Sequence, residues 1–311
     1  MAPLALLPFR TAYVIWTALN AALVAALCWL FASSIPAVRD RPTLGMSGFF
    51  FFPVLVSLVL GQDSVILLFI VAAAYNLLHS HRPLLAGLVL SLAAVKFQYL
   101  LVLTCLLLLA GKRRLVLGIM LGATALLAVS AAVSGPRGLI SYVGLLRDFS
   151  AHAGYGSLHL DLMVSLRGFL AGIGSKSHTL FLFGETGLAV IALACTQARQ
   201  DEASQFAALV TASLLISPYA HFADATVLLL PALIVVNRAI TSPRRILLLA
   251  ITAALFIVPL LLIAVGGHYW WNSRIYLFFL AGLAFLLVVA AELYKPAFYG
   301  SESNQPARLQ T

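Results

Sequence analysis

The stretch Pro83–Ala110 reads PLLAGLVLSLAAVKFQYLLVLTCLLLLA and decides the class of fold, because Lys96 is its only charged residue. A helix that spans a bilayer needs about 20 predominantly apolar residues, and this stretch is long enough. Strands of a transmembrane barrel instead show about ten residues of alternating hydrophobicity, which is not the pattern here. The stretch therefore predicts a helical segment inserted in a membrane.

The rest of the chain has the same composition. Apolar residues make up 62% of the 311 residues and charged residues 9%, against about 45–50% and about 25% in soluble domains. Such a chain has too few polar groups to build a surface that faces water. Long apolar runs fall at 11–32, 46–60, 64–79, 83–110, 115–133, 179–197, 203–217, 222–238, 246–265 and 275–293. We expect an all-α polytopic transmembrane bundle of about ten to eleven membrane segments, including short hairpin helices.

The flanks of the opening stretch indicate how it is folded. His79–Arg82 precede it and Lys112–Arg114 follow it, so both flanks are basic. Basic residues accumulate on the cytoplasmic side of membrane proteins, which places both flanks on one side. The run then turns back at Lys96-Phe97-Gln98, and each arm of about 12 residues gives ~18 Å of helix, too short to cross. The alternative is one long helix with a buried Lys96.

The orientation follows from alternating the remaining segments across the membrane. The predicted cytoplasmic segments are 33–45, 80–82, 111–114, 198–202, 239–245 and the tail from 294, and they hold twelve of the nineteen Lys and Arg residues. This bias accounts for the formal net charge of +9 without a nucleic-acid partner. We expect one transmembrane domain, 1–295, with an outer loop at 134–178, and a disordered cytoplasmic tail at 296–311.

With this orientation, several short polar segments that separate the apolar runs fall on the outer side. Ionisable groups at membrane depth cost roughly 2.5–3.5 kcal/mol each, so they tend to face a bundle interior or a pathway. The candidate site residues are Gln62, Asp63, Lys96, Gln98, Arg147, Arg167, Tyr219, His221 and Asp224. Simpler roles stay open, because Asp63 can cap a helix beginning near Ser64, and His221 with Asp224 can be a hydrogen-bonded loop pair.

The remaining sequence patterns indicate helix packing and give no sign of a metal site. Gly118 and Gly122 match the small-xxx-small pattern of packed membrane helices. The chain has no CxxC and no HExxH motif, so we predict neither a metal nor another cofactor, although a metal is compatible with the sequence.

The order of these polar segments along the chain resembles that in glycosyltransferase family 87. This is a membrane family of the GT-C superfamily that is similar to mannosyltransferases and is also catalogued as domain of unknown function 2029. The resemblance covers about residues 3–240. It rests on the motifs Pro8–Trp16, Pro53 with Gly61–Ser64, Ala86–Leu88 with Lys96–Gln98, Lys112–Arg114, and Ser217–Asp224 with Leu230-Pro231.

The resemblance implies a GT-C-like fold and a multi-pass enzyme of the bacterial inner (plasma) membrane. Such an enzyme transfers a hexose, often mannose, from a polyprenyl-phosphate donor to a lipid or glycan acceptor on the extracytoplasmic side. The alternatives are a transporter or flippase for a lipid or small solute, and a non-catalytic membrane subunit.

This sequence differs from the family pattern in one respect. The family's expected catalytic aspartate lies in a first outer loop after an N-terminal helix, and this sequence begins beyond that point. We therefore expect a truncated start or a degenerate homologue, with Asp63 or Asp224 as substitute catalytic carboxylates. Gln62, Lys96, Gln98, Arg147, Arg167, Tyr219 and His221 are then the expected substrate-binding residues.

Overall fold

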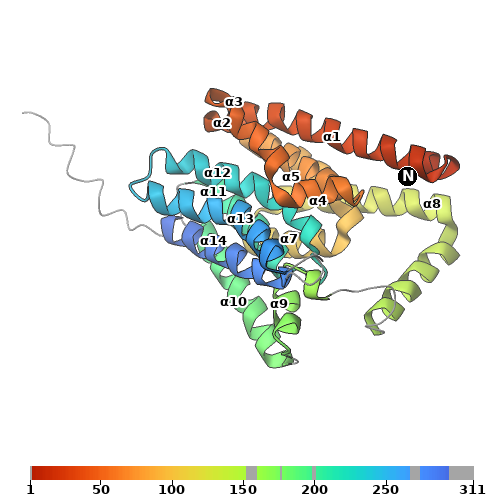
Figure 1. Cartoon of the computed structure of the whole chain (residues 1–311). Helices are drawn as coiled ribbons and strands as arrows, with labels where there is room; N and C mark the ends of the chain where they lie inside the picture. The colour runs from red at the N-terminus through yellow and green to blue at the C-terminus, as the bar shows by residue number, and fades with distance from the viewer. Residues whose placement is uncertain (1, 152–159, 176, 198–200, 267–273, 294–311) are drawn as a thin grey trace, which may run out of the picture.

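A computed structural model of the chain describes residues 2–151, 160–175, 177–197, 201–266 and 274–293. Its elements are η1 (Ala2–Leu6), α1 (Phe9–Ser34), α2 (Pro36–Asp40), α3 (Pro42–Met46), η2 (Ser47–Phe50), α4 (Phe52–Val59), α5 (Ser64–His79), α6 (Pro83–Ser91), η3 (Leu92–Lys96), α7 (Phe97–Leu109), α8 (Arg113–Ala151), η4 (Leu160–Leu162), α9 (Leu166–Gly172), α10 (His178–Gln197), α11 (Glu202–Ile216), η5 (Phe222–Leu228), α12 (Leu229–Ala239), α13 (Arg245–Gly266), η7 (Ile275–Leu277) and α14 (Phe278–Leu293). Within these residues there is no strand, so the predicted all-α polytopic fold is confirmed (Figure 1). The predicted tail, 296–311, lies outside the described residues.

The predicted count of ten to eleven membrane segments is not confirmed. Seven of the described helices are long and apolar enough to cross a membrane, or eight if the bent pair Pro42–Phe50 and Phe52–Val59 is one span. The difference has a simple source: the apolar runs at 64–79 and 203–217 form helices of only 16 and 15 residues. Both are shorter than the 17–25 residues of a typical span.

The predicted hairpin is present. Gly87 of α6 lies against Leu115 and Gly118 of α8, and Gly122 lies against Ser91, so α6 and α8 run side by side in the same direction. The segment between them must therefore run back, although Pro83–Leu109 is long enough to count as a single span. The reversal occurs at Lys96, whose backbone is non-helical (φ −119°, ψ 61°). The long-helix alternative is wrong, and the packing role of Gly118 and Gly122 is confirmed.

The predicted cytoplasmic segments gather at one end of the bundle. Lys112 Nζ lies 3.9 Å from Glu202 Oε1, and Arg238 Nη1 lies 3.7 Å from Asp201 Oδ2. The Ala37 amide donates to Asn237 Oδ1 at 2.9 Å. Four segments that are far apart in the sequence therefore meet, as a common membrane side requires.

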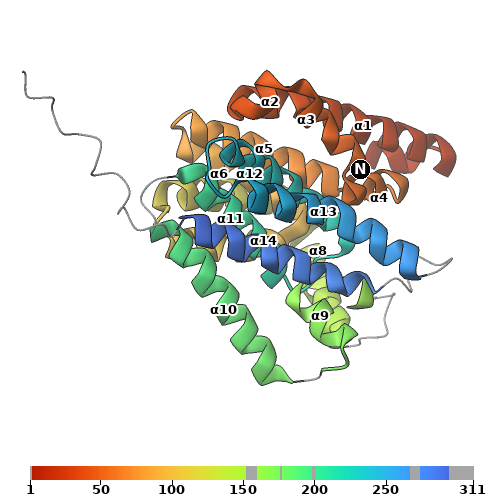
Figure 2. The same cartoon turned by 60° about the vertical axis from the view of Figure 1, so that its left-hand side comes forward.

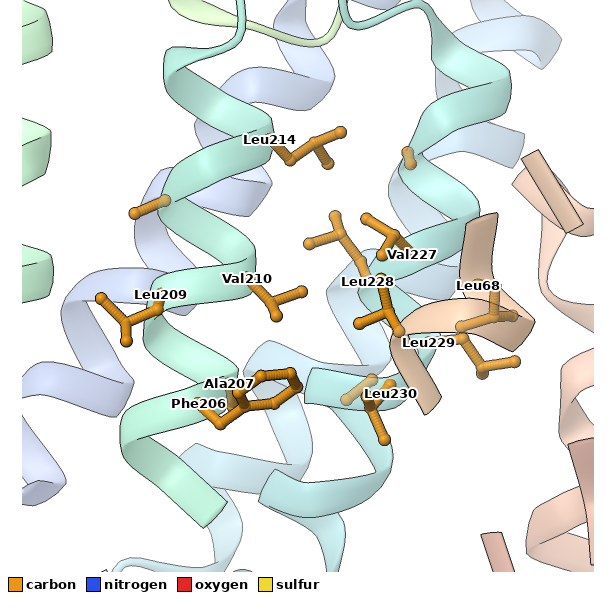
Figure 3. Close-up of a cluster of buried hydrophobic side chains, with 14 of the residues drawn as sticks. Leu68, Phe206, Ala207, Leu209, Val210, Leu214, Val227, Leu228, Leu229 and Leu230 are labelled. Carbon is orange, nitrogen blue, oxygen red and sulfur yellow. The ribbon is translucent and has the colours of Figure 1, made fainter. Parts of the chain in front are cut away.

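The centre of the bundle is formed by α11 together with η5 and α12. In Figure 3, Val210 and Leu214 of α11 point toward the run Val227–Leu230, which has Leu68 of α5 beside it, whereas Leu209 points away from that run. The segment Phe222–Ala239 is the most enclosed of the candidate spans, with 83% of its window buried. This core holds the η5 end in place, and the candidate site lies there.

The outer helices expose apolar side chains. Trp29 on α1, Phe183 on α10 and Ile246 on α13 are all more than 70% exposed. In water such a surface would aggregate, whereas in a bilayer it faces lipid. Figure 2 shows α10, α13 and α14 along the outside of the bundle.

The long helix α8 bends where its first arm leaves the bundle (Figure 1). Gly135 has φ 69° and is followed by Pro136, which interrupts the helical hydrogen bonds. The predicted outer loop, 134–178, therefore contains the second arm of α8 as well as α9.

Candidate functional site

Lys96 lies between two carboxylates at the tip of the α6–α7 hairpin. Its Nζ is 2.9 Å from Asp63 Oδ1 and 3.2 Å from Asp224 Oδ1. The three residues come from the α4–α5 turn, the hairpin turn and η5. With both carboxylates ionised and the amine protonated, the ion triad carries a formal charge of −1. The structure thus joins three predicted site residues through direct contacts.

Asp63 is the more accessible carboxylate of the triad. It occupies the N-cap position of α5, yet its side chain makes no capping hydrogen bond. Its side chain is 30% exposed, against 7% for Asp224. The capping role considered for Asp63 is therefore wrong, and its carboxylate lies beside Lys96 with part of its surface open to a substrate.

The turn that carries Asp63 is held by aromatic side chains of α1. Trp16 Nε1 donates to the Gly61 carbonyl at 2.8 Å, and the Tyr13 hydroxyl donates to the Val59 carbonyl at 2.6 Å. Gly61 has φ +64°, a conformation that glycine adopts without strain. The motif Pro8–Trp16 therefore positions the turn before Asp63, a role that the sequence did not reveal.

Asp224 is held in the site by hydrogen bonds to both of its carboxylate oxygens. Its Oδ1 accepts from Ser64 Oγ at 2.7 Å, and its Oδ2 accepts from the His221 amide at 3.0 Å. His221 and Asp224 form a capping box at the start of η5, which confirms their hydrogen-bonded pairing. Both carboxylate oxygens of Asp224 are thus engaged by the protein. Ser64 belongs to the same network, although it was not among the residues predicted for the site.

Two further predicted residues lie next to the triad in the sequence. Gln62 precedes Asp63 and is half-buried, and its backbone N–H donates to the Ser57 carbonyl at 2.8 Å. Gln98 is half-buried in the first turn of α7, two residues after Lys96. Both amide side chains therefore belong to the elements that form the triad.

Arg167 and Tyr219 form a second cluster at this end. The Arg167 guanidinium lies 4.7 Å from the centre of the Tyr219 ring, within cation–π distance. Both residues line a groove of about 630 Å³ that also includes Ser175, Ser177 and His178. Among the described residues, no carboxylate forms an ion pair with Arg167. This cation is therefore available to an anionic ligand.

Backbone contacts connect the groove to the triad. Met163 and His221 form an isolated antiparallel bridge, and the Val164 amide donates to the Ala220 carbonyl at 2.9 Å. The loop that leads into α9 is thus fixed to the loop that leads into η5. Arg147 lies in α8, but its side chain is outside the described part.

The described residues hold no group of three or more His, Cys, Asp or Glu side chains that could bind a metal ion. The chemistry available from these residues is that of a carboxylate base, an ammonium group, a guanidinium and several amide or hydroxyl donors. The prediction that no cofactor is needed stays a prediction.

The comparisons with known proteins give one match. The sequence model of glycosyltransferase family 87 matches residues 1–218, which is more than half of the chain. No curated protein matches, and no solved structure matches. The matched region contains α1, the hairpin, α9 and most of the residues described above, and it ends just before Tyr219.

Proposed function

The chain belongs to glycosyltransferase family 87, and on this premise we propose that it transfers a hexose, mannose first among them, from a polyprenyl-phosphate donor to a lipid or glycan acceptor. The reaction takes place on the extracytoplasmic face of a bacterial inner membrane. The observation that carries this proposal is the ion triad. It lies at the end of the bundle opposite the basic segments that are predicted to be cytoplasmic. Asp63, a partly exposed carboxylate, lies at the same end of the bundle as the groove that contains Arg167, whose guanidinium forms no ion pair with a carboxylate in the described part of the chain.

Asp63 is the proposed general base. It accepts the proton of the acceptor hydroxyl as the hydroxyl oxygen bonds to the anomeric carbon. The bond between that carbon and the phosphate oxygen breaks, and polyprenyl phosphate leaves with the electron pair. General base catalysis of this kind contributes about 10²–10⁴-fold. Asp224 is a poorer candidate because its two oxygens already accept from Ser64 and His221.

Arg167 is the proposed ligand of the donor phosphate. A guanidinium binds phosphate through two parallel hydrogen bonds, and charge-assisted bonds of this type are about twice as strong as neutral ones. Lys96 is less suited, because it already contacts two carboxylates. It acts as a positioning residue that holds Asp63 in place. Gln62, Gln98 and His221 are then candidates for binding sugar hydroxyls.

The test is sugar transfer by the purified chain reconstituted in liposomes with a lipid acceptor extract. Radiolabelled mannose is supplied either as polyprenyl-phosphate-mannose or as a nucleotide sugar. We expect labelled product from the lipid-linked donor only. Transfer from the nucleotide sugar alone would contradict the donor assignment, because the groove would then serve a different leaving group. Labelled donor that crosses the membrane without forming product would favour the flippase alternative.

A further inference from the structure

A second polar cavity lies at the opposite end of the bundle from Lys96. It has a volume of about 440 Å³ and opens between the base of the α6–α7 hairpin and the start of α11. The charged residues and histidines that line it are His79, His81, Lys112, Arg113, Arg114 and Glu202. Three permanent cations thus face a single carboxylate, and nothing in the proposed transfer reaction uses them.

The cavity has a polar rim and an apolar wall. Leu107 and Leu209 contribute buried aliphatic surface, and Phe206 adds an aromatic ring. Lys112 stands where the two parts meet. Its Nζ lies 3.4 Å from the amide oxygen of the buried Gln205, and 3.9 Å from Glu202. This arrangement orients the ammonium group along the rim of the cavity.

The backbone adds to the positive field. The helices α6, α8 and α11 begin at Pro83, Arg113 and Glu202, and all three residues line the cavity. A helix N-terminus carries a partial positive charge. At α11 the Asp201 carboxylate already accepts from the Ala203 and Ser204 amides, so the positive field at the cavity comes mainly from α6 and α8. The basic side chains and these N-termini together favour an anionic ligand.

We propose that this cavity binds the phosphate head group of an anionic membrane phospholipid. The phosphate contacts Lys112 and Arg113, while an acyl chain lies along Leu107, Phe206 and Leu209. A free phosphate ion would use the cationic rim but leave the apolar wall uncovered. Basic pockets between transmembrane helices are suited to such head groups. This proposal does not depend on the catalytic one, since the two sites lie at opposite ends of the bundle.

The experiment is native mass spectrometry of the delipidated full chain in detergent, titrated with phosphatidylglycerol, with phosphatidylcholine or with inorganic phosphate. The test variant is Lys112→Ala with Arg113→Ala. The matched control is Arg41→Ala with Arg245→Ala, because these exposed cations belong to the same basic end but do not line the cavity. We expect phosphatidylglycerol to bind in preference to phosphatidylcholine. Binding should weaken about 25-fold in the test variant, since each cation near a membrane contributes about fivefold, and stay within about twofold in the control.

A second measurement needs no variant and so does not depend on how a variant folds. A photoactivatable phosphatidylglycerol bound to the unmodified chain should cross-link to 107–115 or 203–209. Equal weakening in the test and control variants, or cross-links confined to other segments, would overturn the proposal. Displacement of the lipid by equimolar inorganic phosphate would identify a free phosphate as the ligand and overturn the assignment to a lipid.

Discussion

Replacement of Lys96 by methionine should destabilise the protein strongly. The substitution keeps an unbranched side chain of similar length and removes the only cation that contacts Asp63 and Asp224 among the described residues. At an effective dielectric constant of 20, unit charges at 2.9 and 3.2 Å attract by about 5–6 kcal/mol each. Desolvation of the three groups offsets much of this energy. Loss of one partner from a buried pair costs about 3–5 kcal/mol in measured cases.

Asp63 is 30% exposed, which places the expected loss near the lower limit of that range, at about 3 kcal/mol. The assay is denaturant unfolding of the purified protein in detergent. Adding Asp224→Asn to Lys96→Met removes the buried unpaired charge and should recover about half of the loss. The control is Arg39→Met, because the Arg39–Asp40 pair is 68% and 70% exposed and should contribute less than about 1 kcal/mol. A loss below about 1 kcal/mol for Lys96→Met would refute the reasoning, since the triad would then not be held by its central cation.

Three further predictions test the packing and the site. Gly87→Ala should lower the free energy of unfolding by about 1–3 kcal/mol or more, because its methyl group would lie 2.1 Å from a backbone oxygen of α8; Gly187→Ala, with no atom within 4 Å, should be neutral or stabilise by up to about 1 kcal/mol in the same unfolding assay. Trp16→Phe should lower the turnover number about tenfold with little change in donor KM, because the hydrogen bond to the Gly61 carbonyl is lost; unchanged turnover would mean that this bond does not position Asp63. Arg167→Lys should raise the donor KM several-fold, because lysine keeps the charge but lacks the planar, bidentate geometry; an unchanged KM would exclude Arg167 from phosphate binding.

The sequence favoured the hairpin over one long helix, and the structure decided between them. Its basic flanks and the single Lys96 between two apolar arms left few arrangements in a bilayer, and the structure has the reversal at that lysine. The packing of Gly118 against α6 was predictable for a similar reason, because small residues four apart form a flat helix face. The number of spans was not predictable. Hydropathy alone does not distinguish a short helix enclosed by protein, such as α11, from one that crosses the membrane.

The site was predictable as a set of residues but not as a set of contacts. Asp63, Lys96 and Asp224 each stood out as charged groups in apolar surroundings, yet nothing in the sequence paired one lysine with both carboxylates. Trp16 was missed because an aromatic residue in an apolar helix has no distinctive pattern. Its hydrogen bond spans 45 residues and exists only through the packing of α1 against the α4–α5 turn.

The central claim is that Asp63 is the general base, and the most direct test compares two aspartate variants in one assay. Asp63→Asn and Asp224→Asn are reconstituted in equal folded amounts, and mannose transfer from polyprenyl-phosphate-mannose is measured under single-turnover conditions. We predict that Asp63→Asn loses at least about 10²-fold in rate, whereas folded Asp224→Asn retains most of its rate and loses mainly stability. A rate for Asp63→Asn within a few-fold of the unmodified enzyme would contradict the claim and would assign the base to another residue.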